Sequence, residues 1–390
     1  MTSLRRGSPS EETASYRGRQ DISGSVQKVK VLGAGSIGNH LSHAARSLGC
    51  SVDIVDPDPA ALQRTREKIY PTRYGRWDDA IKLLTPDAAP RGGYDLICIG
   101  TPPDSHVSLA REAVAERPRA VLVEKPLCGP DLSGGQDLAD EAAAANVAVF
   151  VGYDHVVGQA ARFVHQLVTS GVVANPVTLD VEFREHWGGI MAAHPWLAGP
   201  WETYLGYSAR GGGASGEHSH AANLWQSFAM AAGAGRVVEV QATLDVIRER
   251  GMDYDRLCLM NLRTEMGLVG RCVQDVVTQP PRKWARIQSG DSFLEWTCGF
   301  QPGIDLVTGQ VPGQPTIERR ISKTRPDDFI EEMRHISEAL QSPTLDSPIA
   351  LSRALDTMLV IAAAHRSATS GRRARIDYSR GWTPAAIGLD

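Results

Sequence analysis

Hydrophobic and polar positions follow one pattern before about residue 152 and another after it. In the first part, short apolar runs are separated by amphipathic stretches. The strands expected there are Lys28–Leu32, Val52–Val55, Leu96–Ile99, Ala120–Val123 and Val147–Val151. Residues 37–48, between the first two, repeat apolar residues at helical spacing. Strands that alternate with helices in this way predict an α/β fold, a doubly wound parallel sheet.

The second part has longer strand-like runs, and several of them alternate apolar and polar residues with a period of two. The strands expected there are Val177–Phe183, Val237–Ile247, Arg256–Arg263, Gly267–Val277, Lys283–Ile287 and Phe293–Thr297. Helices are expected over 158–170, near 327–341 and near 348–370. This pattern is typical of a large, mostly antiparallel sheet with one open face in an α+β domain. An apolar open face would need covering, so we expect a homodimer or homotetramer.

The two patterns suggest where the domains begin and end. Residues 1–26 are rich in Ser, Arg, Glu and Gly and nearly free of large apolar residues, so we expect a flexible tail. Residues 27–152 are expected to form one domain around the parallel sheet. Residues 153–390 are expected to form a second domain around the open sheet, with roles in substrate binding and oligomerisation.

Composition narrows the class of protein. The chain has 390 residues, of which 42% are hydrophobic and 22% charged, and a net charge of -4. These values exclude wholesale disorder and give no support for a nucleic-acid or anionic-membrane partner. No apolar run reaches about 18 residues, and the N-terminus lacks the apolar core of a secretory signal. Six scattered cysteines without a CxxC pair indicate a reducing compartment, so we expect a cytoplasmic protein without structural zinc.

A glycine-rich turn follows the first strand and opens the first helix. In the sequence Gly33-Ala-Gly35-Ser36-Ile37-Gly38, the first glycine permits a tight turn and the second lets a diphosphate approach the backbone. The third glycine allows the helix to pack closely on the strand. The free N–H groups and the positive dipole of the helix start then face the phosphates. We therefore expect Gly33, Gly35, Ser36, Ile37 and Gly38 to bind a dinucleotide.

The end of the second strand indicates which dinucleotide binds. Asp56 lies 18 residues after Gly38, and no Arg or Lys follows it until Arg64. A carboxylate at this place accepts hydrogen bonds from ribose hydroxyls and repels a 2′-phosphate. The sequence therefore favours NAD over NADP.

Two further loops follow buried strands. Thr101 and Pro102 come after one strand, and Glu124 and Lys125 come directly after another. Loops at the carboxyl ends of parallel strands line the crevice in which ligands bind. Glu124 and Lys125 are charged and follow the apolar run VLV, so they are not expected to pack in the core. We therefore expect Lys125 to point into that crevice. The alternative is a surface salt bridge.

These features add up to a resemblance. GAGSIG at 33–38, TPPDSH at 101–106, EKP at 124–126 and GYDH at 152–155 stand in the order and spacing of a known family. A glycine-rich segment at 211–223 and the stretch Ala362–Arg372, with Ser367 and Gly371, match its later motifs. Over roughly residues 28–376 the chain resembles the glucose–fructose oxidoreductase/inositol dehydrogenase/MocA (Gfo/Idh/MocA) family of NAD(P)-dependent oxidoreductases.

The resemblance implies a Rossmann domain followed by a domain built on an open antiparallel sheet. It implies that Lys125 lies beside the nicotinamide and the substrate hydroxyl, and that His220 of the third motif acts as acid and base. Further cofactor contacts would come from Thr101, Pro102, His106 and Glu124. Substrate contacts would come from Tyr153, His155, Trp196, Tyr207, Glu217 and Asn223.

The third motif departs from the common pattern of the family, which has Asp four residues before the histidine and another Asp three residues after it. In this chain Glu217 lies three residues before His220 and Asn223 three residues after it. A branch of the family with a Ser-His pair has the same shortened spacing. His155 is followed by Val156 and not by the usual arginine, which leaves carboxylate or phosphate recognition there in doubt.

Candidate chemistry fits this resemblance. Imidazole titrates near neutrality, so His220 suits proton transfer, and a Lys125 cation would stabilise a developing alkoxide. Residues 186–225 hold four of the eight tryptophans, with Tyr204, Tyr207, His186 and His194. Such rings suit the face of a sugar or cyclitol, and the alternative is core or subunit packing. His218 and His220 with Glu217 could also ligate a metal, but their helical spacing turns His218 away, so no metal is expected.

Three functions remain open at this point. The first is an NAD-dependent dehydrogenase or reductase that acts on a CH–OH group of a sugar, amino sugar, nucleotide sugar or cyclitol. The second is a glycosidase or epimerase that oxidises its substrate transiently and recycles bound NAD. The third is a non-catalytic dinucleotide sensor that regulates a partner, which the presence of both Lys125 and His220 argues against.

Overall fold

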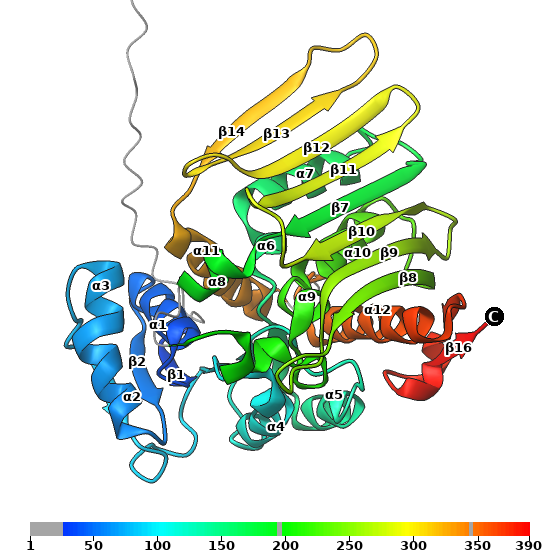
Figure 1. The fold of residues 1–390 in the computed structure, drawn as a ribbon. Helices are drawn as coiled ribbons and strands as arrows, with labels where there is room; N and C mark the ends of the chain where they lie inside the picture. The colour runs from blue at the N-terminus through cyan, green and yellow to red at the C-terminus, as the bar shows by residue number, and fades with distance from the viewer. Residues whose placement is uncertain (1–25, 193–196, 343–345) are drawn as a thin grey trace, which may run out of the picture.

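The chain folds around two sheets (Figure 1). This computed structural model describes residues 26–192, 197–342 and 346–390. The expected tail therefore lies outside the described residues except for Val26, and so do His194 and Trp196. All six cysteines are free thiols, as a sequence without paired spacings suggests. No helix in the described part of the chain is long and apolar enough to cross a membrane.

The first sheet has six parallel strands in the order β3-β2-β1-β4-β5-β6. The strands are β1 (Lys28–Leu32), β2 (Ser51–Val55), β3 (Ile81–Leu84), β4 (Leu96–Ile99), β5 (Ala120–Val123) and β6 (Ala148–Val151). All residues of β4 and β5 are buried, because helices cover both faces of a parallel sheet. The expected doubly wound sheet is thus confirmed. The edge strand β3 was not expected, since only Ile81 in it is buried.

The helices around this sheet are short. They are α1 (Ser36–Ser47), α2 (Pro59–Arg64), α3 (Tyr70–Tyr74), α4 (His106–Ala115) and α5 (Gly135–Ala145). One turn of π-helix, Thr65–Ile69, joins α2 to α3. Helix α1 begins at the last residues of the glycine turn and buries Leu41, Ala44 and Ala45. Its amphipathic face therefore anchors the turn against the sheet.

The second sheet has ten strands in the order β14-β13-β12-β11-β7-β10-β9-β8-β15-β16. Most pairs are antiparallel, as expected, but β7 and β10 run parallel. The strands are β7 (Thr178–Arg184), β8 (Val237–Ile247), β9 (Tyr254–Thr264), β10 (Val269–Asp275), β11 (Arg282–Ser289), β12 (Ser292–Gln301), β13 (Ile304–Gln310), β14 (Ile317–Ser322), β15 (Ala374–Ile376) and β16 (Ile387–Leu389). The last four were not expected. Strand β14 is mostly exposed and charged, and β15 and β16 are three residues each.

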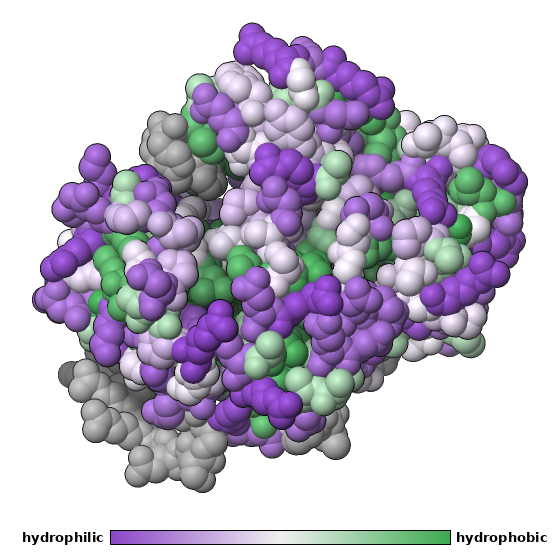
Figure 2. Space-filling view, turned by 90° about the horizontal axis from the view of Figure 1, so that it is seen from below, coloured by the Kyte–Doolittle hydropathy of each residue, from purple (hydrophilic) through white to green (hydrophobic). Residues whose placement is uncertain are grey.

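Helices cover one face of the second sheet (Figure 1). They are α7 (Gln159–Thr169), α10 (His220–Ala231) and α12 (Leu351–Ser370). The open face carries ion pairs, in which Arg271 pairs with Asp180 at 2.7 Å and Arg373 with Glu239 at 3.1 Å, and it also exposes Leu259 of β9. The face seen in Figure 2 is mainly hydrophilic, with hydrophobic residues in smaller areas between.

Three further helices stand between the sheets. Helix α6 (Asp154–Val157) follows β6 directly, and α9 (Gly213–Glu217) precedes α10. Helix α11 (Arg325–Gln341) packs on both α1 and α6. Its start is capped by Thr324 and Asp327. A short helix α8 (Trp187–Ala192) follows β7. The carboxyl ends of β4, β5 and β6 thus face the second sheet across these helices.

Candidate active site

The glycine turn has the shape that a bound diphosphate requires. Gly33 has a φ of +100°, and a Cβ on it would lie 2.9 Å from the Gly100 oxygen. A Cβ on Gly38 would lie 1.9 Å from the Gly33 oxygen, whereas one on Gly35 would meet nothing within 4 Å. The first and third glycines are therefore required for packing, and the space beside Gly35 is open. This cradle fits a dinucleotide at the start of α1.

Asp56 lies immediately beside this turn. Its Oδ2 accepts a hydrogen bond from the Ala34 N–H at 2.8 Å, and its Oδ1 accepts one from the Asp58 N–H at 2.9 Å. The carboxylate is thus fixed by the backbone at the end of β2, where the sequence places a ribose contact.

A buried histidine connects the two other expected cofactor loops. The His106 ring nitrogens lie 2.8 Å from the Pro126 oxygen and 2.8 Å from the Thr101 oxygen. Burial lowers the pKa of His106. Pro102 precedes a short 3₁₀ turn in the same loop. His106 therefore lies between the loops after β4 and β5, and in the neutral ring one of its two nitrogens donates a hydrogen bond to one of these oxygens.

A cavity of about 360 Å³ lies between the glycine turn and the second sheet. It brings together side chains that the sequence singled out: Ser36, Ile37, Glu124, Lys125, His155, Glu217 and His220. It also holds charged side chains that the sequence did not single out: Arg73, Asp154, Glu185, Lys283 and Arg325. The cavity is thus lined mainly by groups that donate or accept hydrogen bonds.

Lys125 is held by Glu217 from the other part of the chain. Its Nζ donates to the Glu217 backbone oxygen at 2.9 Å and lies 3.2 Å from Oε2. The Tyr204 hydroxyl donates to the same Oε2 at 3.3 Å. Burial opposes ionisation of Glu217, but the Lys125 cation, His218 and the hydrogen bonds from Lys125 and Tyr204 together outweigh it, so the pKa of this carboxyl lies below its usual value. Glu217, expected to contact substrate, is thus first a partner of Lys125.

Glu124 follows the last residue of β5 and directly precedes Lys125. It is buried, and a Cβ on Gly152 would come within 2.9 Å of its carboxyl group. Burial and the nearby charge of Asp154 raise the pKa of Glu124 to about 8. At neutral pH this side chain is therefore mainly the uncharged acid.

His220 is the first residue of α10 and faces Asp154. Its Nδ1 lies 3.6 Å from Asp154 Oδ1, and His155 Nδ1 lies 3.7 Å from the same oxygen. These three atoms are buried and have no hydrogen-bond partner among the described residues. Burial, with the cations Lys125 and Lys283, lowers the pKa of His220 well below the usual value. A neutral imidazole of this kind can accept a proton.

The same three residues could in principle hold a metal ion, because their ligand atoms lie within 4.8 Å of one another. The surroundings favour hydrogen bonds instead. Lys283 Nζ lies 3.5 Å from His155 Nε2, and an ammonium group can only donate. His155 therefore carries its own proton on Nδ1, the atom that a metal would need. This set differs from His218, His220 and Glu217, which the sequence suggested and set aside.

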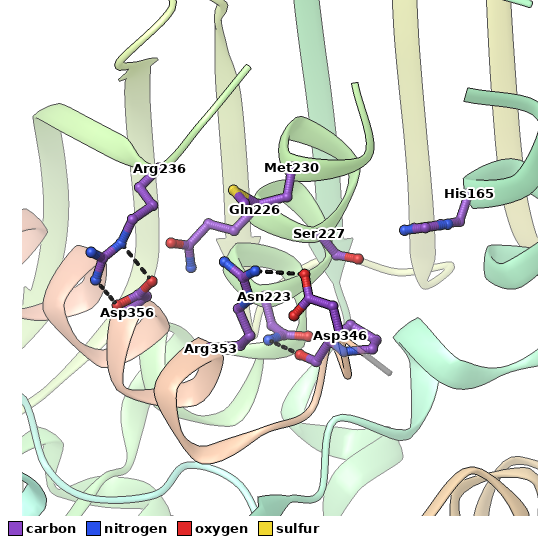
Figure 3. Close-up of a pocket in the computed structure, with 10 residues that line it drawn as sticks. His165, Asn223, Gln226, Ser227, Met230, Arg236, Asp346, Arg353 and Asp356 are labelled. Atoms are coloured by element: carbon purple, nitrogen blue, oxygen red, sulfur yellow. Dashed lines mark hydrogen bonds and ion pairs between the residues drawn. The ribbon is translucent and has the colours of Figure 1, made fainter. Parts of the chain in front are cut away.

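Three expected substrate contacts are described but lie away from the cavity lining. Tyr153 is fully buried, with its ring edge-on to His220 at 5.7 Å between centroids. The Tyr207 hydroxyl donates to the Trp201 oxygen at 3.2 Å. Asn223 donates to the Pro348 oxygen at 3.3 Å in a separate small cavity beside the Arg236–Asp356 and Arg353–Asp346 pairs (Figure 3). The fourth, Trp196, lies outside the described residues.

The expected aromatic wall is distributed through the packing. Trp225 is fully buried, and its Nε1 donates to the Leu179 oxygen at 2.8 Å. Trp187 and Trp201 pack with Tyr207 against a small core cluster that contains Met252. The described tryptophans of this segment thus follow the packing interpretation.

Sequence reasoning missed Asp154, Glu185, Lys283 and Arg325. Asp154 had a usable signal, because it lies in the GYDH motif after a buried strand, as Lys125 does in its own motif. Lys283 and Arg325 are single cations at the start of a strand and a helix, a position shared by many surface residues.

Comparison with known proteins identifies the first part of the chain. Residues 27–153 match a family described as an oxidoreductase family with an NAD-binding Rossmann fold. No curated protein sequence matches the chain.

Solved structures match nearly the whole chain in fold. An oxidoreductase from Agrobacterium radiobacter in complex with NAD+, L-tartaric acid and magnesium is 18% identical, with a TM-score of 0.70, over 90% of this chain and 98% of that one. The WlbA dehydrogenase from Bordetella pertussis, in complex with NADH and UDP-GlcNAcA, is 19% identical, with a TM-score of 0.66, over 90% of this chain and 98% of that one. An inositol dehydrogenase homolog from Azotobacter vinelandii, complexed with NADH and myo-inositol, is 15% identical, with a TM-score of 0.68 over 89% and 96%.

At these identities the solved structures establish the fold, and the family match establishes the cofactor class of the first sheet. The resemblance seen in the motifs is confirmed for residues 27–153, which match the Gfo/Idh/MocA oxidoreductase family with its NAD-binding Rossmann fold, and the chain as a whole shares the fold of solved oxidoreductases.

Proposed function

We propose that the protein is an NAD-dependent dehydrogenase or reductase. It transfers hydride between nicotinamide and a secondary hydroxyl or keto group of a sugar, amino sugar, nucleotide sugar or cyclitol. The observation that carries the proposal is the meeting of Lys125 and His220, which lie 95 positions apart, in one polar cavity beside the glycine turn. The solved structures bound to myo-inositol and UDP-GlcNAcA support this substrate class.

The division of labour follows from the two sheets. We propose residues 27–152 as the dinucleotide-binding domain and residues 153–390 as the substrate-binding domain. Gly33, Gly35 and the Ser36–Gly38 start of α1 would hold the diphosphate, and Asp56 would contact the ribose. NAD, when bound, supplies the hydride acceptor or donor.

The protein residues supply charge and proton transfer. In the oxidative direction, His220 Nε2 would accept the hydroxyl proton, and NAD, when bound, would accept the hydride from the carbon that carries this hydroxyl. The Lys125 ammonium group stabilises the negative charge that develops on the substrate oxygen. Glu217 keeps Lys125 in place through the 2.9 Å and 3.2 Å contacts. In the reductive direction, His220 returns its proton to the oxygen.

The rest of the cavity suits a substrate with several hydroxyl groups. Glu185 and Lys283 lie 3.5 Å apart on the wall formed by the second sheet, and Arg325 lies at the start of α11. Carboxylates accept hydrogen bonds from hydroxyls, and cations donate to them. A mixed lining of this kind recognises polyols by hydrogen bonding rather than by burial of apolar surface.

The test is a direct assay of cofactor reduction. The purified protein is mixed with NAD and a panel of sugars, sugar derivatives and cyclitols that includes myo-inositol, and NADH absorbance is recorded. We expect NADH in proportion to the substrate consumed. A product without net NADH would instead establish the recycling glycosidase or epimerase reaction. NAD binding without any product across the panel would favour the non-catalytic sensor.

A further inference from the structure

We propose that Asp154 is a positioning residue for His220. Its carboxylate selects the tautomer of His220 that leaves Nε2 free to take the substrate proton. The inference rests on the proposed function, in which His220 is the acid and base. It adds a residue whose role neither the motifs nor the comparisons assign.

The placement of Asp154 is rigid and specific. It is the first residue of α6, directly after β6, and is 4% exposed. Its Oδ1 lies 3.6 Å from His220 Nδ1 and 3.7 Å from His155 Nδ1, and the two imidazole rings are 4.7 Å apart. A movement of about half an ångström would bring each nitrogen within hydrogen-bond distance. Hydrogen bonds in catalytic sites are often long without ligand and shorten in the substrate complex.

The neighbours of the two histidines determine where their protons lie. Lys283 Nζ is 3.5 Å from His155 Nε2 and can only donate, so His155 carries its proton on Nδ1 and directs it at Asp154. An ionised carboxylate can only accept, so His220 likewise carries its proton on the Nδ1 that faces Asp154. Two N–H groups then converge on one oxygen that has no other partner.

The charge around His220 makes this carboxylate necessary. The groups that lower the pKa of His220, besides burial, are Lys125 after β5, Lys283 on β11, His218 after α9 and Arg325 on α11. All of them oppose a positive charge on the imidazole. When His220 takes a proton, the buried imidazolium needs a compensating negative charge. Asp154 is the carboxylate within reach, so it also stabilises the protonated form.

The direct test is the protonation state of His220, measured by NMR on the NAD-bound protein with isotope-labelled histidine rings. His220→Gln assigns the signal. We expect the proton of His220 on Nδ1 in the unmodified protein. In Asp154→Asn we expect part of the population to move its proton to Nε2, because the amide can donate as well as accept. A proton on Nε2 in the unmodified protein, or an unchanged tautomer in Asp154→Asn, would overturn the proposal.

A matched control is available on α11. Glu332 is a fully buried carboxyl group whose two oxygens have no hydrogen-bond partner, and it does not line the cavity. Burial and the nearby carboxyl groups of Glu124, Asp154 and Asp328 raise its pKa well above the usual value, and Glu332→Gln replaces the carboxyl group by an amide of similar shape. We expect this variant to leave the His220 tautomer unchanged. An equal change in both variants would show a general effect of buried carboxyl groups and reject the specific role.

The kinetic test uses a substrate found in the panel. Replacing the carboxylate by an amide at a carboxylate–histidine pair lowers kcat by about 10⁴ in serine proteases, and we expect a loss of about 10²–10⁴ in Asp154→Asn. NAD affinity should stay within about twofold, because the glycine turn is untouched. The acid limb of the pH profile should move to lower pH, since loss of a nearby carboxylate lowers the pKa of His220. An unchanged kcat and profile would contradict the proposal.

The two tests separate failure of the inference from failure of the proposed function. If no panel member is oxidised, the NMR measurement still decides the role of Asp154. If Asp154→Asn lowers the melting temperature too far for study, Asp154→Glu retains the negative charge. We expect Asp154→Glu to keep the Nδ1 tautomer, and its loss there would reject the proposal.

Discussion

The cofactor end and the substrate end of the cavity are built in different ways. At the cofactor end, one hexapeptide supplies the shape, and the groups that would face the dinucleotide are mostly backbone atoms and glycines. At the substrate end, side chains converge from β5, α6, α9, α10, β11 and α11. A backbone cradle is a local property of the chain, whereas a cluster of side chains depends on the whole fold. Added side-chain volume should therefore disturb the cofactor end most, and loss of a charged side chain should disturb the substrate end most.

The largest expected effect tests the substrate end. His220→Ala should lower kcat by about 10²–10⁴, because it removes the proton acceptor from the cavity. NAD affinity should remain close to normal, since the glycine turn is separate. Steady-state kinetics and NAD titration measure the two quantities.

His218→Ala is the control for this variant. His218 is also buried, and burial lowers its pKa to about 4, but it is not paired with Asp154. We expect a milder loss than in His220→Ala. A severe loss in His218→Ala with near-normal turnover in His220→Ala would show that the third motif is wrongly aligned.

A pair of glycine variants tests the cofactor end. Gly38→Ala places a Cβ 1.9 Å from the Gly33 oxygen, so the backbone must shift, at a cost of about 1–3 kcal/mol or more. We expect a lower melting temperature and weaker NAD binding. Gly35→Ala meets nothing within 4 Å and has a φ of -83°, so its stability should be normal while NAD binding falls. Equal melting temperatures in the two variants would contradict this account of the turn.

The packing of α1 against α11 is expected to lose stability in acid. The His40 ring on α1 stacks on the Phe329 ring of α11 with 4.7 Å between their centroids. Burial lowers the pKa of His40 to about 3. Below about pH 6.5 His40 becomes protonated in the unfolded chain but stays neutral in the folded protein. The free energy of unfolding therefore falls as pH drops from about 6.5 towards 3. At about pH 5 the loss from this residue is about 2 kcal/mol. Urea unfolding of the parent protein and His40→Gln at about pH 7 and pH 5 measures it. An equal pH dependence in both would remove His40 as the cause.

The smallest expected effect concerns cofactor choice. Asp56→Ala removes the carboxylate that the Ala34 and Asp58 N–H groups orient beside the glycine turn. We expect the parent protein to prefer NAD and the variant to lose about tenfold of that preference, which is about 1.4 kcal/mol. Kinetics or titration with NAD and NADP measure the ratio. A tenfold preference of the parent protein for NADP would contradict the assignment.

The same difference explains how much the sequence could predict. The sequence could single out the glycine turn, Asp56 and Lys125 because strand ends and glycine spacing are local signals. His220 was placed by resemblance, and its meeting with Lys125 agrees with the structure. Tyr207 and Asn223 face other parts of the packing, which the motif alone does not show. Asp154 went unnoticed because its partner His220 is 66 residues away, and only the fold brings them together.

The predicted fold was right in its two sheets and incomplete at their edges. The central strands of the first sheet are continuous apolar runs, which is the strongest signal for a buried strand. The edge strand β14 was missed because it is mostly exposed and charged. Strand β13 was also missed, although its burial alternates with a period of two. The parallel pairing of β7 with β10 could not be predicted from either strand alone, since it depends on long-range register.

The edge of the first sheet has a consequence for how the protein is made. Strand β6 ends the sheet, and its Val151 N–H donates to the Ile349 oxygen at 2.8 Å, while Phe150 bridges to Ala350. The Trp382 N–H reaches back further, to Gln136 Oε1 on α5 at 2.9 Å. During translation the Rossmann strands therefore leave the ribosome long before the segment that covers their edge. Open strand edges favour pairing with other chains, so we expect the nascent protein to be most prone to aggregation until residue 350 has emerged.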